Sequence, residues 1–302
     1  MTMTASDGPF VATLEDRGVV AVTGADAAKL LGGLVTNDMA LLDDAKVPAL
    51  YAALLSPQGK ILFDFLVVRA GDGFLLETAR ARAGDLVKRL AMYKLRAAVE
   101  IRDVSADFVV AALWGSGPVA SGDVERSIAF VDPRLPALGR RILADARSAE
   151  DVLAIAGRAS ASAHAYHAHR IRLGVPEGGR DFTFGDTFPH EALLDQLNGV
   201  SFTKGCFVGQ EVVSRMQHRA AVRKRIVCAV ADEPLPEGHV PVLAGEAEIG
   251  RLGSVAGRRG LALVRIDRVA EAQRGGTQLS AGGVALSVAV PAFASFRIEA
   301  AA

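Results

Sequence analysis

The stretch KGCFVGQE holds the residue types with the clearest chemistry in this chain of 302 residues. Cys206, one of only two cysteines, lies between Gly205 and Gly209, and Lys204 and Glu211 close the stretch. The glycines permit backbone angles barred to other residues and let a ligand approach closely. A nearby cation and a helix start both stabilise a thiolate. The stretch therefore predicts a reactive thiol or, alternatively, a small buried cysteine in tight glycine packing.

A helix is predicted directly after the second glycine. Val212, Met216 and Ala220 follow at positions i, i+4 and i+8, which is one helical face. Arg215 and Arg219 share a different face. The glutamate of the stretch falls in the first turn, where a carboxylate suits the helix dipole.

The same region carries a strong local excess of positive charge. Six basic residues stand against one acid between residues 204 and 225: Lys204, Arg215, Arg219, Arg223, Lys224 and Arg225 against Glu211. The resulting local charge of +5 predicts a binding site for a polyanionic tail or a phosphate backbone. The alternative is a solvated face with no ligand.

Bulk composition limits the class of protein. The chain is 50% hydrophobic, 23% charged and carries a formal net charge of +0, which favours a packed core in about two domains. This balance gives no general reason to expect DNA or an acidic membrane as partner. The N-terminus lacks the pattern of a signal peptide, and no apolar run is long enough for a membrane span. Two cysteines provide neither a disulfide framework nor a four-thiolate metal site, so we expect a cytoplasmic protein with reduced thiols.

Periodicity predicts the elements that must position the thiol. We expect a strand at 18–24, a helix at 25–35 capped by Asp26, and two strands within 50–69 around a turn at Pro57 and Gly59. A strand follows within 71–78, and then an amphipathic helix within 79–95 with apolar Leu86, Leu90 and Met92. Further strands are expected near 99–104, 108–114 and 140–145, and residues 150–173 are expected to be mostly helical. Residues 174–204 show little periodicity, and long irregular segments are often functional.

The texture of the chain changes after residue 222. Short apolar runs separated by Gly and Pro lie within 225–232, 240–257, 260–267 and 284–290. Such a pattern predicts a small antiparallel barrel or sandwich. We therefore expect two domains, residues 1–222 and residues 223–302.

The chemistry-bearing stretch has a known relative. KGCFVGQE resembles the KGC-aromatic-x-GQE signature of the YgfZ family of folate-binding proteins, which are related to the aminomethyltransferase (T-protein) of the glycine cleavage system. GLVTNDMALL, YAALLSPQGKILFDF, RIRLGVPEGGRDF and DTFPHEALLD are similar to that family too, in family order. The resemblance covers nearly the whole chain.

The resemblance implies a fold and a role. The fold is α+β, a T-protein-like ring of two intertwined α+β lobes with a C-terminal antiparallel β-barrel and a folate site in the central channel. The implied cofactor is tetrahydrofolate or a one-carbon derivative. The implied role is support of iron–sulfur cluster assembly or repair and of iron–sulfur-dependent tRNA modification. The implied partners are iron–sulfur assembly proteins or client iron–sulfur enzymes, with the chain itself a monomer.

Residues of the thiol stretch carry over one by one. Cys206 matches the motif cysteine and is the key thiol by this resemblance. Its motif neighbours are expected at the folate: Lys204, Gly205, Gly209, Gln210 and Glu211. Arg215 and Arg223 of the basic run are expected to attract the polyglutamate tail of the folate or a protein partner.

Two positions depart from the T-protein pattern. Asp64 aligns with an acidic position of the pattern GGILDDL, where an aspartate handles a proton at a folate nitrogen, but the acidic pair is here Phe63–Asp64. Asp64 is thus either a catalytic acid or a strand-end carboxylate in solvent. Arg172 stands where the T-protein pattern has a glutamate that grips the pterin. Because a guanidinium only donates hydrogen bonds, Arg172 argues against pterin recognition of the T-protein type.

Three more residues are candidates for the folate. Tyr166 falls where some YgfZ members carry a Trp near the folate, and its alternative is a half-buried helix aromatic. Asp186 and Glu191 match acidic positions before the motif and can accept pterin N–H groups. They can equally cap a helix beginning near Pro189.

Other motifs in the sequence give no further indication of function. His164, His167 and His169 form HxxHxH, but nothing nearby in sequence completes a set of about four metal ligands, so we expect no metal site. The chain has no Walker loop, no dinucleotide fingerprint after a strand and no nucleophile elbow.

Three hypotheses of function remain. The first is a folate-binding accessory protein of iron–sulfur metabolism that uses Cys206. The second is a folate-dependent aminomethyl or methyl transferase that uses Asp64. The third is an RNA-binding accessory protein, which the neutral net charge and the lack of aromatics in the basic run disfavour, so that direct nucleic-acid binding is not expected.

Overall fold

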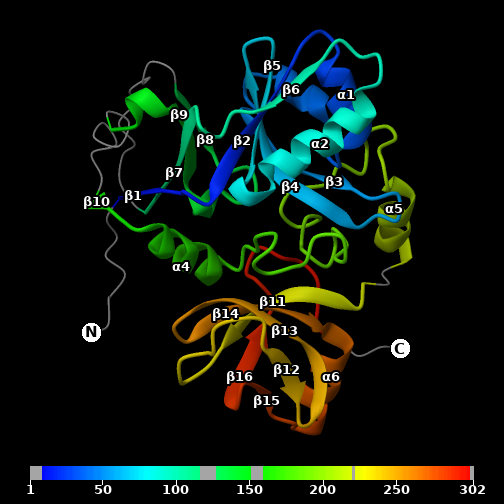
Figure 1. The fold of residues 1–302 in the computed structure, drawn as a ribbon. Helices are drawn as coiled ribbons and strands as arrows, with labels where there is room; N and C mark the ends of the chain where they lie inside the picture. The colour runs from blue at the N-terminus through cyan, green and yellow to red at the C-terminus, as the bar shows by residue number, and fades with distance from the viewer. Residues whose placement is uncertain (1–8, 116–126, 151–158, 220–221, 300–302) are drawn as a thin grey trace. The chain divides into compact units, whose positions relative to one another are not determined.

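The computed structural model describes residues 9–115, 127–150, 159–219 and 222–299 (Figure 1). The chain forms two compact units: Met1–Ala52 with Phe65–Tyr166, and Ala53–Asp64 with His167–Ala302. The domain boundary predicted between residues 222 and 223 stays a prediction. In the described part of the chain, no helix is long and apolar enough to cross a membrane.

One five-stranded sheet contains the predicted N-terminal strand and the predicted hairpin. Its order is β3 (Ala49–Leu55), β4 (Ile61–Ala70), β5 (Gly73–Ala79), β2 (Arg17–Thr23) and β6 (Glu100–Asp103). All of β3 and nearly all of β2 are buried, so these runs read as continuously apolar rather than alternating. The turn between β3 and β4 is closed by the Gly59 N–H, which donates to the Ser56 carbonyl at 2.8 Å.

Two helices pack against this sheet, α1 (Ala27–Leu34) and α2 (Ala83–Lys94). Leu86 and Leu90 are buried as predicted, but Met92 is exposed because it lies on the outer face of α2. Asp26 stands at the start of α1, yet its carboxylate accepts the N–H of Ala98 at 2.8 Å instead of capping the helix.

The second sheet has the order β10 (Ala159–Ser160), β1 (Phe10–Thr13), β7 (Phe108–Trp114), β9 (Arg140–Asp145) and β8 (Ser127–Val131). The β10–β1 pair is parallel and the other pairs are antiparallel. Short 3₁₀ helices lie at Met39–Asp43, Arg80–Arg82, Pro136–Leu138 and Ala146–Ser148. The strands predicted near 99–104, 108–114 and 140–145 are confirmed.

Residues 150–173 were predicted to be mostly helical, and α4 (Ala163–Leu173) confirms the later part, but Ala159–Ser160 form strand β10 and residues 151–158 lie outside the described residues. The helix predicted after the glycine stretch is confirmed as α5 (Gln210–Arg219). Between them the chain runs in turns, as its lack of periodicity predicted. A helix beginning at Pro189 was wrong, because Leu193 and Asn198 have φ angles of 63° and 58° that interrupt a right-handed helix.

The predicted barrel is confirmed as a closed six-stranded one. Its order is β11 (Lys224–Val230), β14 (Arg259–Arg265), β13 (Ala247–Ala256), β12 (Pro241–Ala244), β15 (Leu279–Ala281) and β16 (Val284–Ala289), and antiparallel pairing of β16 with β11 closes it. The strands surround a core of buried aliphatic side chains. One element was not predicted, namely α6 (Ile266–Gly275), which packs against β12 and β14 (Figure 1).

Candidate functional site

Two glycines lock the thiol stretch onto the β3–β4 hairpin within the second unit. Gly209 has a φ of +80°, and a β-carbon there would lie 2.6 Å from the carbonyl oxygen of Ser56. Gly59 has a φ of +79°, and a β-carbon there would lie 2.9 Å from the Val212 side chain of α5. Both positions thus need glycine for backbone angle and for space. Two stretches about 150 residues apart in the sequence thereby form one packed base.

The Cys206 thiol is accessible to solvent beside this packed base. Cys206 is exposed, and α5 begins four residues after it, at Gln210. Phe207 is buried, and the Lys204 Nζ lies 5.2 Å from the centre of its ring. The Lys204 N–H donates to the Ser201 hydroxyl at 3.2 Å, which shapes the turn before the cysteine. An exposed thiol on a fixed loop is available to a soft metal, to an oxidant or to another thiol.

The basic run is less available than its sequence indicated. The Arg225 Nη1 lies 2.7 Å from a carboxylate oxygen of Asp195, and both side chains are buried. Arg215 pairs with Glu211 of the same helix at 2.5 Å. Arg223 is exposed. The local charge of +5 already counts Glu211, the partner of Arg215, but it overstates the positive surface because Asp195, outside the run, pairs with Arg225.

Two acids predicted for the folate lie near the same hairpin. Lys60 of the hairpin donates to the Asp186 carbonyl, and its Nζ lies 3.5 Å from the centre of the Phe188 ring. The Glu191 carboxylate accepts the N–H of Phe188 at 2.9 Å. Burial raises the pKa of Glu191, and that hydrogen bond and Lys60 oppose the rise. Asp186 is exposed. Glu191 thus caps a turn here, and the role of either acid toward folate stays a prediction.

Asp64 is a buried carboxylate. It is 4% exposed, so the alternative of a strand-end aspartate in solvent was wrong. A β-carbon at Gly178 would lie 2.8 Å from the Asp64 Oδ1, which leaves only glycine beside it. The role of Asp64 toward a folate stays a prediction. Arg172, which replaces the T-protein glutamate, is exposed and lies 2.8 Å from the ring nitrogen Nδ1 of His169.

Tyr166 is held in a buried ionic cluster of the first unit. Its side chain is 2% exposed, its hydroxyl accepts from Arg141 at 2.9 Å, and its ring meets Trp114 edge-on at 5.5 Å. Burial raises the pKa of Tyr166, although Arg141 and Arg134 oppose the rise. Stacking of a pterin on Tyr166 stays a prediction.

Other members of this cluster were not predicted. Glu77 pairs with Arg17 at 2.7 Å and with Arg141 at 3.5 Å, and Asp132 pairs with Arg134 at 2.7 Å. Burial alone would raise the pKa of Asp132, but Arg134 and Arg141 outweigh it and hold that pKa below its usual range. Asp132 and Arg134 are neighbours in the chain, but Arg17 lies 60 residues from Glu77, so no local pattern could have found the whole cluster.

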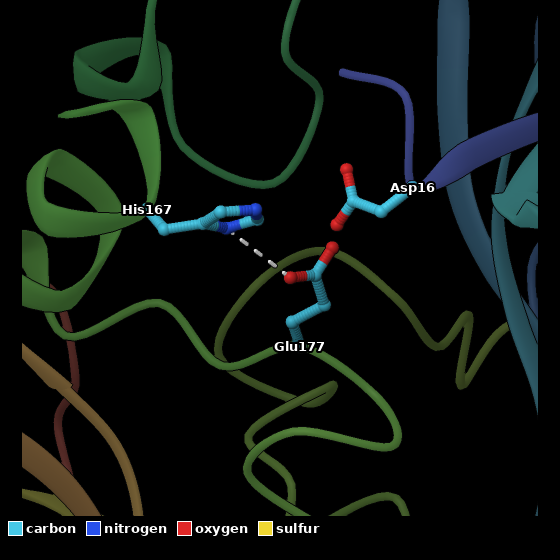
Figure 2. Close-up of side chains that lie close together, drawn as sticks. All are labelled: Asp16, His167 and Glu177. Carbon is cyan, nitrogen blue, oxygen red and sulfur yellow. Dashed lines mark ion pairs between the residues drawn. The ribbon is translucent and has the colours of Figure 1, made fainter. Parts of the chain in front are cut away.

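The three histidines of HxxHxH have separate surroundings. His164 is exposed, whereas the His167 Nδ1 lies 3.5 Å from a Glu177 oxygen, the contact drawn as a dashed line in Figure 2. The Arg170 Nε also donates to His167, at 3.1 Å, and its Nη1 lies 2.6 Å from Asp181. This set ties α4 to the loop that follows it.

Comparison with known proteins separates fold from family. The domain family described as "GCVT N-terminal domain" matches residues 13–125, and "CAF17, C-terminal beta-barrel domain" matches residues 223–296. A crystal structure of glycine cleavage system aminomethyltransferase T from Bartonella henselae superposes with a TM-score of 0.76 over 95% of this chain and 86% of that chain. Its identity is 18%, so it shows the fold alone. The expected α+β fold of the T-protein type with a C-terminal barrel is confirmed.

Sequence relatives decide the family. The human protein named "Iron-sulfur cluster assembly factor IBA57, mitochondrial" is 34% identical over 279 residues, which are 85% of this chain and 77% of that protein. The chain belongs to the IBA57 family. A relative from Mycosarcoma maydis with the same name, marked as a homolog, is 38% identical over 229 residues, 72% of this chain. That match spans 56% of the fungal protein, so the chain corresponds to little more than half of its length.

These relatives correct one expectation. A cytoplasmic location was predicted, but the relatives from human, mouse and Mycosarcoma maydis are each named as mitochondrial. The prediction was wrong because it rested on cysteine count and on the lack of a secretory pattern. Those features indicate that the protein works under reducing conditions, but they do not identify the compartment.

Proposed function

We propose that this chain is an assembly factor for iron–sulfur clusters in which Cys206 is the working thiol. The observation that carries the proposal is the exposed Cys206 on a loop whose base is fixed by Gly209 and Gly59. Membership of the IBA57 family, whose relatives are named as iron–sulfur cluster assembly factors, supports the assignment. The KGCFVGQE signature supports a finer placement beside YgfZ-type proteins.

The chemistry of the site fits that role. Thiolates are the ligands that iron–sulfur clusters use, and a thiol must be accessible to meet a cluster held by another protein. A rigid base lowers the entropic cost of presenting the thiol, because the loop is already in place. Cys206 would contact a cluster or a partner thiol transiently, and support of iron–sulfur-dependent tRNA modification would follow through the client enzymes.

We also propose that the chain binds tetrahydrofolate or a one-carbon derivative. Asp64 supports this, because a buried carboxylate can accept N–H groups of the pterin. Bound folate would supply one-carbon chemistry or act as a structural ligand. Glu191 and the exposed Arg223 are the further candidates on the second unit, for the pterin and for the anionic tail.

Replacement of the human relative tests the assembly role. The full chain, given a mitochondrial leader, is expressed in human cells depleted of the IBA57 protein. The proposal predicts that the activity of a four-iron enzyme returns, normalised to the amount of that enzyme. A cluster-free mitochondrial enzyme is the control. No recovery at matched expression would contradict the assembly role.

Thermal denaturation with tetrahydrofolate tests the cofactor separately. A ligand that binds only the folded state raises Tm with concentration. We expect such a rise, smaller at high salt because screening weakens attraction of the anionic tail. Asp64→Asn should reduce the rise in Tm, since the neutral amide offers a weaker acceptor. A Tm that stays constant over a broad range of tetrahydrofolate would count against folate binding.

A second candidate function is folate-dependent transfer of an aminomethyl or methyl group. The burial of Asp64 favours it, because a buried acid can handle a proton at a folate nitrogen. The assay is formation of methylenetetrahydrofolate from an aminomethyl or N-methyl donor. Activity that survives Cys206→Ser and is lost in Asp64→Asn would favour this candidate over the first.

A further inference from the structure

The turn that ends α2 contains a leucine in a conformation that suits glycine. Leu95 has φ 46° and ψ −107°, and the Ala97 N–H donates to the Lys94 carbonyl at 2.8 Å across it. These angles match the first central position of a type II′ turn, where glycine predominates. A β-carbon at positive φ meets its own backbone, so the side chain strains the turn.

The same leucine has almost no cover in the first unit. Leu95 is 88% exposed and Met92, three residues earlier, is 68% exposed. Their α-carbons can lie at most about 11 Å apart. Leu95 therefore does not stabilise the fold, since its backbone is strained and its side chain lies in water. Strained positions of this kind concentrate at functional sites, and two exposed apolar side chains three residues apart can form part of a contact surface.

The charge around this pair is mainly positive. Four basic side chains stand against one acid between residues 85 and 96, a net charge of +3: Lys88, Arg89, Lys94 and Arg96 against Asp85. The Lys88 side chain is 82% exposed, with its Nζ 3.7 Å from an Asp85 oxygen, and Arg96 is exposed. A complementary surface would carry carboxylates around an apolar pocket.

We propose that Leu95 and Met92 are the apolar anchors of a docking surface for a protein partner whose apolar pocket is bordered by carboxylates. The class of that partner, an iron–sulfur assembly or client protein, rests on the proposed function. A protein pocket fits better than a membrane surface. The inner residues Leu86 and Leu90 of α2 are fully buried, and Met92 and Leu95 are the large apolar side chains that residues 83–96 leave exposed. Protein interfaces obtain much of their binding energy from a few such anchors, whereas an interfacial helix needs a whole apolar face.

Substitution of Leu95 separates docking from folding. Leu95→Ala removes the anchor and keeps the strained backbone, and Leu95→Gly removes the anchor and relieves the strain. We expect an unchanged Tm for Leu95→Ala and an equal or higher Tm for Leu95→Gly. In the depleted human cells, both variants should need about tenfold more protein for half-recovery of the four-iron enzyme. Leu41→Ala is the matched control, because Leu41 is an exposed leucine of the same unit, 46% exposed, and should change neither readout.

Charge reversal tests the chemistry of the partner. The double variant Lys88→Glu, Arg96→Glu should also weaken recovery with little change in Tm, because both side chains are exposed. Sedimentation with phosphatidylglycerol vesicles tests the membrane alternative, and no Leu95-dependent binding is expected.

The outcomes are distinct. If the parent chain restores nothing, the proposed function fails and the partner class falls with it. If the parent restores activity and the Leu95 variants do so at the same dose, the docking surface alone is wrong. A large fall in Tm for Leu95→Gly would assign the leucine a structural role instead. Full recovery by the charge-reversal variant, or vesicle binding lost in Leu95→Gly, would each overturn a carboxylate-bordered protein pocket.

Discussion

The two cysteines of the second unit have opposite environments. Cys206 is exposed on an irregular loop, whereas Cys228 is half-buried in β11, opposite Leu261 of β14 and Ala289 of β16. Burial raises the pKa of Cys228, although Arg259 opposes the rise. The backbone at Gly174 packs against this thiol, since a β-carbon there would lie 3.0 Å from the Cys228 Sγ. The difference teaches that backbone placement, more than residue type, decides which thiol of this chain can react.

The loop of Cys206 combines exposure with a fixed base. Exposed loops are usually mobile, because few contacts order them. Here the glycine at 209 lets the loop backbone approach the hairpin carbonyl of Ser56, and burial of Phe207 adds apolar contact. The different exposure of the two thiols therefore depends on how the glycines pack the Cys206 loop as well as on where each cysteine lies.

The largest loss of folding stability is expected when a side chain is added at Gly209, where the loop packs on the hairpin. Gly209→Ala should lower the free energy of unfolding by about 3 kcal/mol, because the residue must hold a φ of +80° and its β-carbon would meet a backbone oxygen at 2.6 Å. Urea denaturation measures the loss.

Gly205→Ala is the matched control in the same loop. A β-carbon at position 205 would meet no atom within 4 Å, so its effect should stay within about 0.5 kcal/mol. Equal losses for the two alanines would show that the loop is not held as described.

Alkylation of the native protein should separate the two thiols. We expect iodoacetamide to modify Cys206 at least about tenfold faster than Cys228, since burial protects the second thiol and disfavours its thiolate. Mass spectrometry of the two cysteine peptides gives the rates. In urea the rates should converge, and equal rates without urea would remove the difference between the two sites.

A smaller effect is expected in the pH dependence of stability. Because the folded-state pKa of Cys228 is raised, its contribution is fully present below the ordinary thiol pKa and is lost as pH rises through the raised value. The parent should lose stability in alkaline solution more steeply than Cys228→Ala. Partial exposure of the thiol keeps the difference small. Parallel curves for parent and variant, from denaturation at several pH values, would contradict a raised pKa.

Much of the fold followed from local patterns. The strand β2, the β3–β4 hairpin and helix α5 were predicted, because periodicity and turn residues at Pro57 and Gly59 act over a few neighbours. Helix α6 was missed, because the strand predicted within 260–267 includes its first two residues and no element was predicted over 268–275. The helix expected at Pro189 fails at Leu193, whose positive φ depends on the surrounding packing.

The site could be predicted only in part. Sequence pointed to the thiol stretch and to the hairpin, but the contact between Gly209 and Ser56 joins segments far apart in the chain. The pairing of Arg225 with Asp195 is equally non-local, so the basic run looked freer than it is. The exposure of Leu95 could not be predicted, because a leucine in an amphipathic pattern is typical of a core residue.

Replacement of each cysteine in turn, in cells depleted of the human relative, tests the central claim most directly. The account predicts that Cys206→Ser loses recovery of the four-iron enzyme while its Tm equals that of the parent, and that Cys228→Ser retains recovery at matched protein level. Full recovery with Cys206→Ser would contradict the account, because the exposed thiol would then be dispensable.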